Sequence, residues 1–162
     1  HIKYLINQAR DDSSGYDPTE MGFNYRMTNI EAALGLAQMK RLDGFLKTKK
    51  VFRQIYQEEL GELDFIRFQK AYDDAESSRW FTSICIERDT DIEELRKKLS
   101  EKGIPTRRVF MPLVNVLHFR RYKKDSCKNA NHLYDKSICL PSSTLNSGDD
   151  VYRVCKTIKG LL

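Results

Sequence analysis

The 162-residue sequence predicts an α/β fold in which helices pack on one face of a sheet. Three observations lead to this prediction. Short runs of alternating polarity, typical of strands, are followed by amphipathic helical patterns in the second half of the chain. A long helical pattern precedes them. Hydrophobic residues make up 40% of the chain, which suffices for an ordinary domain with its own core. This combination favours a two-layer arrangement of helices on a sheet.

The longest helical pattern lies within residues 21–60 and begins with a capping signal. Thr28 precedes Glu31 by three residues, so the hydroxyl and the carboxylate can satisfy free N–H groups of the first turn. Asn24 and Arg26 lie within a turn of this N-terminus, where the positive end of the helix dipole favours an anion. An amide and a guanidinium there would suit a phosphate or a carboxylate. The alternative is that both side chains brace the loop.

The body of this pattern carries an apolar stripe that recurs at helical spacing from Ile30 to Leu60. Gly61 is predicted to end the helix. Gly35 and Gly44 weaken the pattern, so we expect a bend or a close helix contact at these two positions. An exposed apolar stripe on such a helix would offer a surface for a second subunit.

The rest of the chain predicts a small sheet with its helices. The run at 80–87 alternates well and is predicted to be a central strand. Gly103 is predicted to end the helix at 91–102. Two aspartates, Asp149 and Asp150, precede the last predicted helix, where they suit the positive end of its dipole. The predicted elements are strands at 63–68 and 80–87, a helix at 91–102, an extended segment from 104, a helix at 129–136, a strand from 137 and a helix at 151–162.

Charge and hydropathy point away from nucleic acid and membranes. Lys and Arg number 28 against 23 acidic residues, and the charges are mostly interleaved, as on solvated helix faces. One basic cluster, residues 120–124, lies in no recognised nucleic-acid-binding motif. No apolar run approaches the ~20 residues that span a bilayer, and no signal-peptide pattern is present. The alternative to an enzyme is a small basic α/β interaction or nucleic-acid-binding module without catalysis.

The cysteines predict reduced thiols rather than a metal site. None of Cys85, Cys127, Cys139 and Cys155 forms a C-x-x-C pair, and the three histidines are scattered. We therefore assign no metal ligand. Buried thiols of this kind behave as small apolar residues, and a cytoplasmic, reducing compartment fits them best.

Arg107 and Arg108 are adjacent in a segment that is predicted to be extended. Alternate residues of a strand point to opposite faces, so one of the two arginines faces a core or a cleft. An unpaired guanidinium would be costly there, which implies a carboxylate or phosphate partner from the protein or from a ligand. A structural salt bridge is the commoner explanation for any single arginine.

The run from Gly22 to Gln38 reads GFNYRMTNIEAALGLAQ and resembles the signature of the DegT/DnrJ/EryC1/StrS family of pyridoxal-phosphate-dependent sugar aminotransferases. GIPTRRVFMPL at 103–113 and SICLPSSTL at 137–145 are also similar to family segments. The resemblance covers nearly the whole chain. It implies the C-terminal small domain of the aspartate-aminotransferase fold type (fold type I), with a long linking helix. Residues 1–49 would be the tail of the large cofactor domain and the start of that helix, and residues 50–162 the small α/β domain.

The resemblance also implies a set of site residues. Asn24 occupies the position that reaches across a homodimer to the cofactor phosphate of the partner subunit. Tyr25, Arg26, Arg107 and Arg108 are the expected substrate contacts. The substrates would be a nucleotide-diphosphate sugar with a 4-keto-6-deoxy ring and an amino donor, glutamate, in surface polysaccharide or antibiotic sugar biosynthesis.

Two family features have no counterpart in this sequence. A family histidine that follows Pro-Leu is replaced by Val114, so that contact is not carried over, and His118 is expected at the surface. The lysine that forms a Schiff base with pyridoxal phosphate lies upstream in the family, and no lysine of this chain has that setting. We therefore assign no catalytic residue and expect the chain to be a fragment that is inactive alone.

Overall fold

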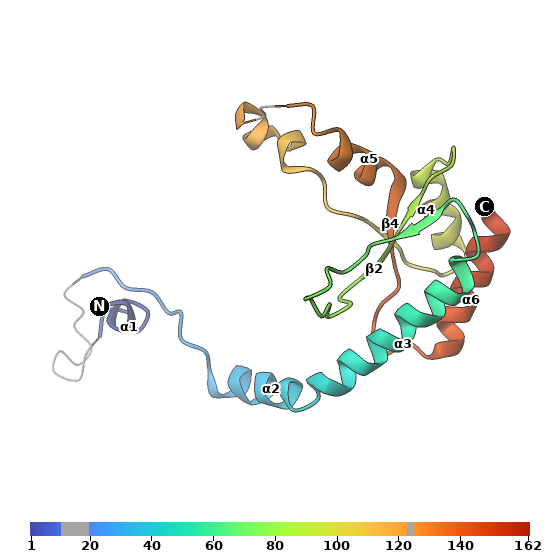
Figure 1. Ribbon diagram of the computed structural model, residues 1–162. Coiled ribbons are helices and arrows are strands. Elements are labelled where there is room, and N and C mark those ends of the chain that lie inside the picture. Colours follow the sequence, from blue (N-terminus) through green and yellow to red (C-terminus); the bar gives the residue numbers. More distant parts are fainter. Residues whose placement is uncertain (11–19, 123–124) are drawn as a thin grey trace. The chain divides into compact units, whose positions relative to one another are not determined.

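The computed structural model describes residues 1–10, 20–122 and 125–162, which form two compact units (Figure 1). Unit 1 comprises His1–Asp43 and unit 2 comprises Gly44–Leu162. The predicted domain boundary between residues 49 and 50 falls slightly later, within the same helix. Two lysines of the basic cluster, at 123 and 124, lie outside the described residues.

Unit 1 contains two helices, α1 (Ile2–Leu5) and α2 (Asn29–Met39), joined through a short antiparallel backbone pairing. Asn7 and Asn24 form an isolated β-bridge, and the amide N–H of Phe23 donates to the carbonyl of Leu5 (2.7 Å). Gly22 is required beside this pairing, because a Cβ at this position would overlap the backbone of residues 8 and 9. The segment that precedes α2 is thus held by the backbone of the chain's first turn.

The long helical pattern is divided into α2 and α3 (Leu42–Leu60). The break lies at residues 40–41, where the N–H of Arg41 donates to the carbonyl of Gln38 in a 3₁₀-type bond. The prediction of a bend or a close contact at Gly35 and Gly44 is therefore wrong. Both glycines lie inside helices, and a Cβ on either would meet no described atom within 4 Å. A glycine lowers helix stability but does not by itself bend a helix.

The sheet of unit 2 has four antiparallel strands in the order β1-β2-β4-β3. Their bounds are Ile66–Phe68 for β1, Thr82–Ile86 for β2, Arg107–Arg108 for β3 and Ser137–Leu140 for β4. The prediction that the second strand is central is confirmed, since β2 pairs with both β1 and β4. The first strand is shorter than predicted.

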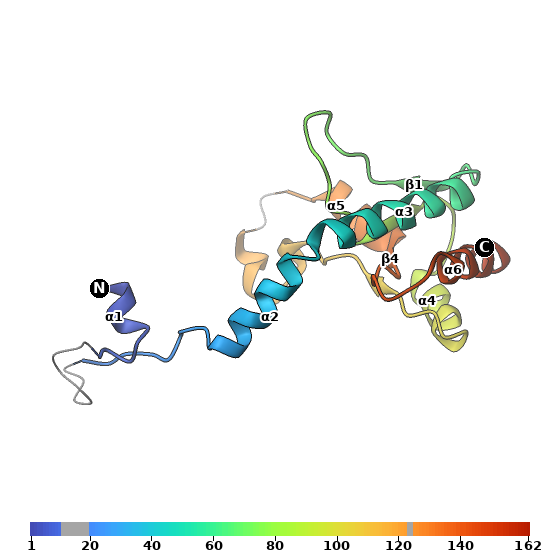
Figure 2. The ribbon, with the colours of Figure 1, turned by 90° about the horizontal axis from the view of Figure 1, so that it is seen from below.

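One face of the sheet is covered by α3, α4 (Ile92–Glu101) and α6 (Gly148–Leu161), and both ribbon views show this side (Figures 1 and 2). Their apolar side chains form a continuous core with the inward-facing residues of β2 and β4. Fully buried members include Tyr56, Leu60, Ile84, Leu99, Ile138 and Ile158. This core provides the rigid layer on which the opposite face of the sheet is supported.

The opposite face is approached by α5 (Lys128–Lys136), which follows two short 3₁₀ helices, η1 (Leu113–Asn115) and η2 (Leu117–Tyr122). Side chains of α5 line a groove together with residues of β2 and β4 that point away from the core. The prediction that the helices cover one face is therefore confirmed for three helices and wrong for α5.

Helix ends in unit 2 follow the local signals in the sequence. Gly103 adopts a left-handed φ of 71° just after α4, as its predicted role in closing that helix requires. Ser147 and Asp150 form a complete capping box at the start of α6. Gly61 follows the last residue of α3, which confirms that predicted stop.

Candidate functional site

The loop before α2 holds three of the predicted site residues close together in the chain and exposed. The backbone bridge to Asn7 holds Asn24, and the ring of Tyr25 stacks on Phe23 with centroids 5.3 Å apart. Arg26 donates from Nη1 to Asn7 Oδ1 at 2.8 Å. The backbone of this loop is thus ordered by local pairing, while the Asn24 and Tyr25 side chains are accessible to a ligand. The alternative that Arg26 braces the loop has direct support in its bond to Asn7.

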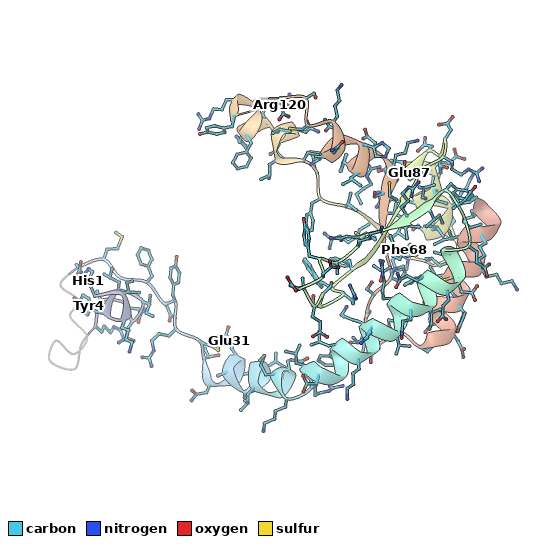
Figure 3. All side chains as sticks on the ribbon, in the orientation of Figure 1. His1, Tyr4, Glu31, Phe68, Glu87 and Arg120 are labelled. Atoms are coloured by element: carbon cyan, nitrogen blue, oxygen red, sulfur yellow. The ribbon has the colours of Figure 1, made fainter. Side chains whose placement is uncertain are left out.

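The start of α2 is capped as predicted. The Thr28 hydroxyl accepts from the Glu31 N–H (3.3 Å), and Glu31 Oε2 accepts from the Thr28 N–H (2.7 Å); Figure 3 labels Glu31 in this first turn. The bond from the Thr28 backbone, followed by that from its side chain, lowers the pKa of Glu31. The cap fixes where the helix begins and hence the spacing between Asn24 and the helix N-terminus.

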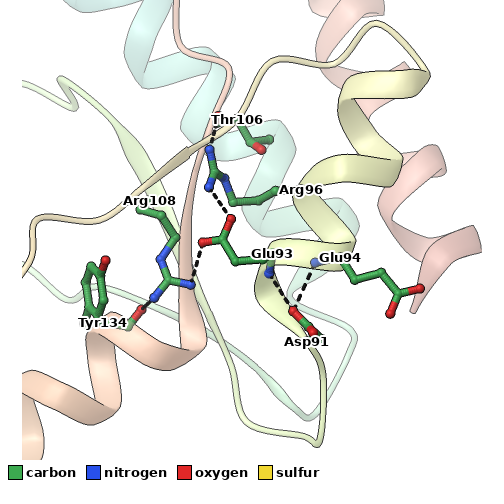
Figure 4. A network of polar contacts seen from close by, with 7 residues as sticks. All are labelled: Asp91, Glu93, Glu94, Arg96, Thr106, Arg108 and Tyr134. Carbon is green, nitrogen blue, oxygen red and sulfur yellow. Dashed lines mark hydrogen bonds and ion pairs between the residues drawn. The ribbon is translucent and has the colours of Figure 1, made fainter.

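Arg108 is engaged by protein groups rather than left open for a ligand (Figure 4). Its guanidinium contacts Glu93 Oε1 (3.2 Å), donates to the Tyr134 carbonyl (2.6 Å) and lies 4.2 Å from the centre of the Tyr134 ring. Glu93 also pairs with Arg96 (2.7 Å), which donates in turn to the Thr106 carbonyl (3.4 Å). The carboxylate partner that the sequence required for one arginine is therefore Glu93, in the first turn of α4.

Arg107 lies on the other face of the sheet, as the alternation of a strand demands. Its guanidinium stands 4.9 Å from the ring centre of Phe81 and 5.6 Å from that of Phe110, and the residue is exposed. Cation–π contacts of this kind hold a guanidinium loosely at a surface without neutralising its charge. Of the two arginines, Arg107 is the one that offers charge to a ligand.

An apolar groove of about 670 Å³ runs along this open face of the sheet. Aromatic side chains dominate it, and the Trp80 ring lies 4.5 Å from Phe81 and 6.4 Å from Phe110. Trp80 and Phe110 are largely exposed. Sequence reasoning assigned no site role to these three aromatics. Their grouping depends on strand register, and the only sequence signal was the Trp-Phe pair at the start of a strand.

One rim of the groove is tied to α3 by a lysine that sequence reasoning also missed. Lys49 Nζ donates to the carbonyls of Ser142 (2.6 Å) and Trp80 (3.1 Å). Burial lowers the pKa of Lys49. Tyr56 adds a bond from its hydroxyl to the Pro141 carbonyl (2.9 Å), and burial raises its pKa. Lys49 therefore ties the backbone of Trp80 to that of Ser142, and Tyr56 holds the neighbouring Pro141.

The other residues that the sequence analysis singled out, His118, Val114 and the cysteines, add nothing to this groove apart from Cys85 and Cys139, which line it. His118 is exposed, as expected, and Val114 is half-buried in η1. All four cysteines belong to the described residues and none of them is in a disulfide, and burial raises the pKa of Cys155 to about 12. Within the described part of the chain, no helix is long and apolar enough to cross a membrane.

The arrangement of elements matches solved aminotransferases. It superposes on the aminotransferase TlmJ from Streptoalloteichus hindustanus with a TM-score of 0.84 at 19% identity, covering 98% of this chain and 43% of that one. The fold is therefore that of the corresponding part of the pyridoxal-phosphate aminotransferases of fold type I, as predicted.

Sequence comparison defines the family. The model of the DegT/DnrJ/EryC1/StrS aminotransferase family matches residues 1–159, and the chain belongs to this family. It is 35% identical to a GDP-perosamine synthase from Escherichia coli O157:H7, over 85% of this chain and 37% of that protein. It is 29% identical to a dTDP-4-amino-4,6-dideoxy-D-glucose transaminase from Escherichia coli, over 88% of this chain and 40% of that protein. The chain thus spans about two fifths of the length of these relatives.

Proposed function

We propose that this chain is the C-terminal part of an aminotransferase that moves an amino group from glutamate onto the keto carbon of a nucleotide-linked 4-keto-6-deoxy sugar. The observation that carries the proposal is the family match over residues 1–159. Relatives named as GDP-perosamine synthase and as a dTDP-sugar transaminase support a nucleotide sugar as the substrate. This family membership leaves no observation that favours the alternative of a basic binding module. Surface polysaccharide or antibiotic sugar synthesis in the cytoplasm is the setting that suits the substrate and the free thiols.

The cofactor in this proposal is pyridoxal phosphate, and the loop before α2 fits its phosphate. An exposed amide at Asn24, on a backbone fixed by the bridge to Asn7, lies just before a helix N-terminus, where an anion is favoured. The bound cofactor would supply the electron sink for amino transfer, while the protein supplies orientation and charge. Asn24 would hold the phosphate, and Tyr25 and Arg26 would border the substrate beside it.

A homodimer is part of the same proposal, since Asn24 would serve the site of the partner subunit. Unpartnered apolar surface on α2 supports this assembly. No residue of α2 is buried, and Ile30, Leu34 and Met39 are 82%, 63% and 65% exposed. Apolar helix surfaces of this kind are normally covered by other parts of a protein or by a partner subunit. A second subunit, or the rest of the polypeptide, would cover α2.

The two arginines receive different roles. Arg107 would meet the diphosphate of the sugar nucleotide or the carboxylate of the amino donor, because its charge is exposed beside the aromatic groove. Arg108 would act as a positioning residue, because its contacts with Glu93 and Tyr134 anchor the strand that carries Arg107. No group of this chain is assigned the catalytic proton transfers, and the chain alone is expected to show no turnover.

A subunit-complementation experiment tests the proposal. In the full-length enzyme, Asn24→Ala should weaken retention of pyridoxal phosphate while the fold and the dimer persist. Mixing Asn24→Ala subunits with subunits that lack the cofactor-bonding lysine should restore activity, since one site of each heterodimer would then carry both defects and the other neither. Asn146→Ala, at an asparagine that has no role in the proposal, is the matched control and should retain its own activity. Confirmed heterodimers without recovered activity would contradict a role for Asn24 across the subunit interface.

A further inference from the structure

Three side chains with metal-binding atoms converge where the end of β2 meets α5. Cys85 and Glu87 are two residues apart and point to the same face of the strand, away from the core. His132 reaches them from the middle of α5. The thiol sulfur, a carboxylate oxygen and a ring nitrogen all lie within 4.8 Å of one another. Figure 3 labels Glu87 at this end of the sheet.

Glu87 already contacts both of the other groups. His132 Nε2 lies 3.0 Å from Glu87 Oε2, and the Cys85 thiol lies 3.7 Å from Glu87 Oε1. Ligand atoms of a tetrahedral zinc ion, bonded at about 2.0–2.3 Å, are separated by roughly 3.3–3.8 Å. Cys85 is buried, so small rotations of the exposed Glu87 and His132 side chains would bring these atoms to the required separations.

We propose that Cys85, Glu87 and His132 form a zinc site, with a thiolate, a carboxylate and an imidazole as ligands. This mixture of soft and borderline donors suits Zn²⁺ rather than Mg²⁺ or Ca²⁺, which take oxygen ligands. Three protein ligands leave a fourth position for water on the groove side, where Cys85 and Glu87 line the wall. Among the described residues, no other group of His, Cys, Asp and Glu side chains converges in this way.

The position of α5 gives the ion a structural consequence. This helix has no buried residue, and it is tied to the sheet by the chain that continues into β4 and by the contacts of Tyr134 with Arg108 of β3. An ion shared between β2 and His132 would fasten the helix to the sheet across the end of the groove. Binding should therefore stabilise the folded chain in proportion to the logarithm of the zinc concentration.

One neighbouring cation competes with the ion. Arg67 Nε lies 3.8 Å from Glu87 Oε1, and the Arg67 side chain is 70% exposed. A guanidinium in this position would repel Zn²⁺ and occupy the carboxylate. Because the side chain is exposed, it can turn away when the ion binds. Arg67→Ala should consequently raise the affinity for zinc.

Cobalt titration of the purified chain tests the site. Co²⁺ should bind with one equivalent and produce a near-ultraviolet thiolate-to-cobalt absorption band, and Zn²⁺ should displace it. Cys85→Ser should abolish the band. His132→Gln, at an exposed position where folding is not at risk, should weaken zinc binding by at least about 10–100-fold, the loss typical even for outer-shell partners. Cys127→Ser and His118→Gln provide a matched thiol and a matched histidine outside the cluster and should leave binding unchanged.

The outcomes separate the zinc site from adventitious binding. An absent band, or equal loss of affinity in the control variants, would overturn the proposal. Should Cys85→Ser fail to fold by circular dichroism, the pair His132→Gln and Arg67→Ala still decides, since weaker binding in the first and tighter binding in the second are both required. None of these readouts depends on transamination, so failure here leaves the proposed enzymatic function untouched.

Discussion

Arg107 and Arg108 are neighbours in the chain but have different surroundings. The pleat of β3 sends Arg108 toward Glu93 on α4 and Arg107 toward the aromatic rings of the open face. Arg108 has its charge paired within the protein, whereas the guanidinium of Arg107 lies over the ring of Phe81. Adjacent residues of one type can therefore serve stability and recognition separately.

This difference predicts opposite phenotypes for the two alanine variants in the full-length enzyme. Arg107→Ala should raise KM for one substrate roughly ten- to a hundred-fold, because a charge-assisted contact contributes about 1.5–3 kcal/mol. Arg108→Ala should instead lower the free energy of unfolding by about 1–3 kcal/mol, since Glu93 loses one of its two arginine partners and the Tyr134 carbonyl loses its donor. Steady-state kinetics and urea denaturation measure the two effects.

Two further variants serve as controls for the arginine pair. Glu93→Gln should reproduce part of the stability loss of Arg108→Ala, because Arg108 keeps its contacts with Tyr134. Lys97→Ala, an exposed position on α4, should change neither quantity. If Arg107→Ala leaves both Michaelis constants unchanged, Arg107 is not a substrate contact.

At the scale of elements, α6 depends on the capping box formed by Ser147 and Asp150. Asp150 Oδ2 accepts from the Ser147 N–H and hydroxyl (both 2.8 Å), and the Ser147 hydroxyl accepts from the Asp150 N–H (3.2 Å). The bond from the Ser147 backbone, then that from its side chain, lowers the pKa of Asp150. A carboxyl whose pKa is lower in the folded state stabilises it above the unfolded pKa, and that contribution is lost as the pH falls through the folded value.

We therefore expect the effect of Asp150→Ala to depend on pH. At neutral pH the variant should unfold at lower denaturant concentration than the wild type. Well below the ordinary aspartate pKa of about 3.9, where Asp150 is protonated, the two should converge. Asp149→Ala, in the same helical turn but outside the capping box, is the matched control and should show a smaller difference. A constant difference between wild type and Asp150→Ala at all pH values would show that the charge plays no part.

Most elements could be predicted because their signals are local. The capping box of Thr28 and Glu31 predicted the start of α2, periodicity and Gly103 predicted α4 closely, and periodicity predicted α6 with a start three residues too late. The helix break at residues 40–41 could not be predicted, because a change to 3₁₀ bonding there leaves no mark in composition. The face taken by α5 was also missed. A helix with a weakly apolar surface can pack on either face of a sheet. The chain segments before and after α5 determine which face it takes.

At the scale of the molecule, the two units differ in how they are stabilised. The apolar core lies in unit 2, whereas in the described part of unit 1 only Ala9 is fully buried. Unit 1 depends instead on backbone pairing between its first turn and the loop that carries Asn24. Exposed apolar residues with almost no core of their own, as in unit 1, are typical of a surface that other protein covers.

The contrast predicts unequal effects of the same substitution in the two units. Leu99→Ala, at a fully buried position, should lower the free energy of unfolding by about 2–5 kcal/mol. Leu34→Ala, at a position 63% exposed on α2, should change it by less than about 0.5 kcal/mol. Trp80 fluorescence during urea unfolding reports on unit 2 directly. In the full-length enzyme Leu34→Glu should weaken the dimer, as sedimentation would show, and an unchanged dimer would contradict the role given to α2.

The sequence by itself determined the types of the elements, the helix caps, the fold class and the family, because these depend on local patterns and on a long contiguous motif. Only the tertiary structure decided that Glu93 holds Arg108, that Arg107 lies over Phe81, and that Cys85 and His132 meet beside Glu87. These contacts join residues from different strands and helices. The distances between these side chains depend on the register of the strands and on the path of α5. Neither can be derived from residue spacing along the chain.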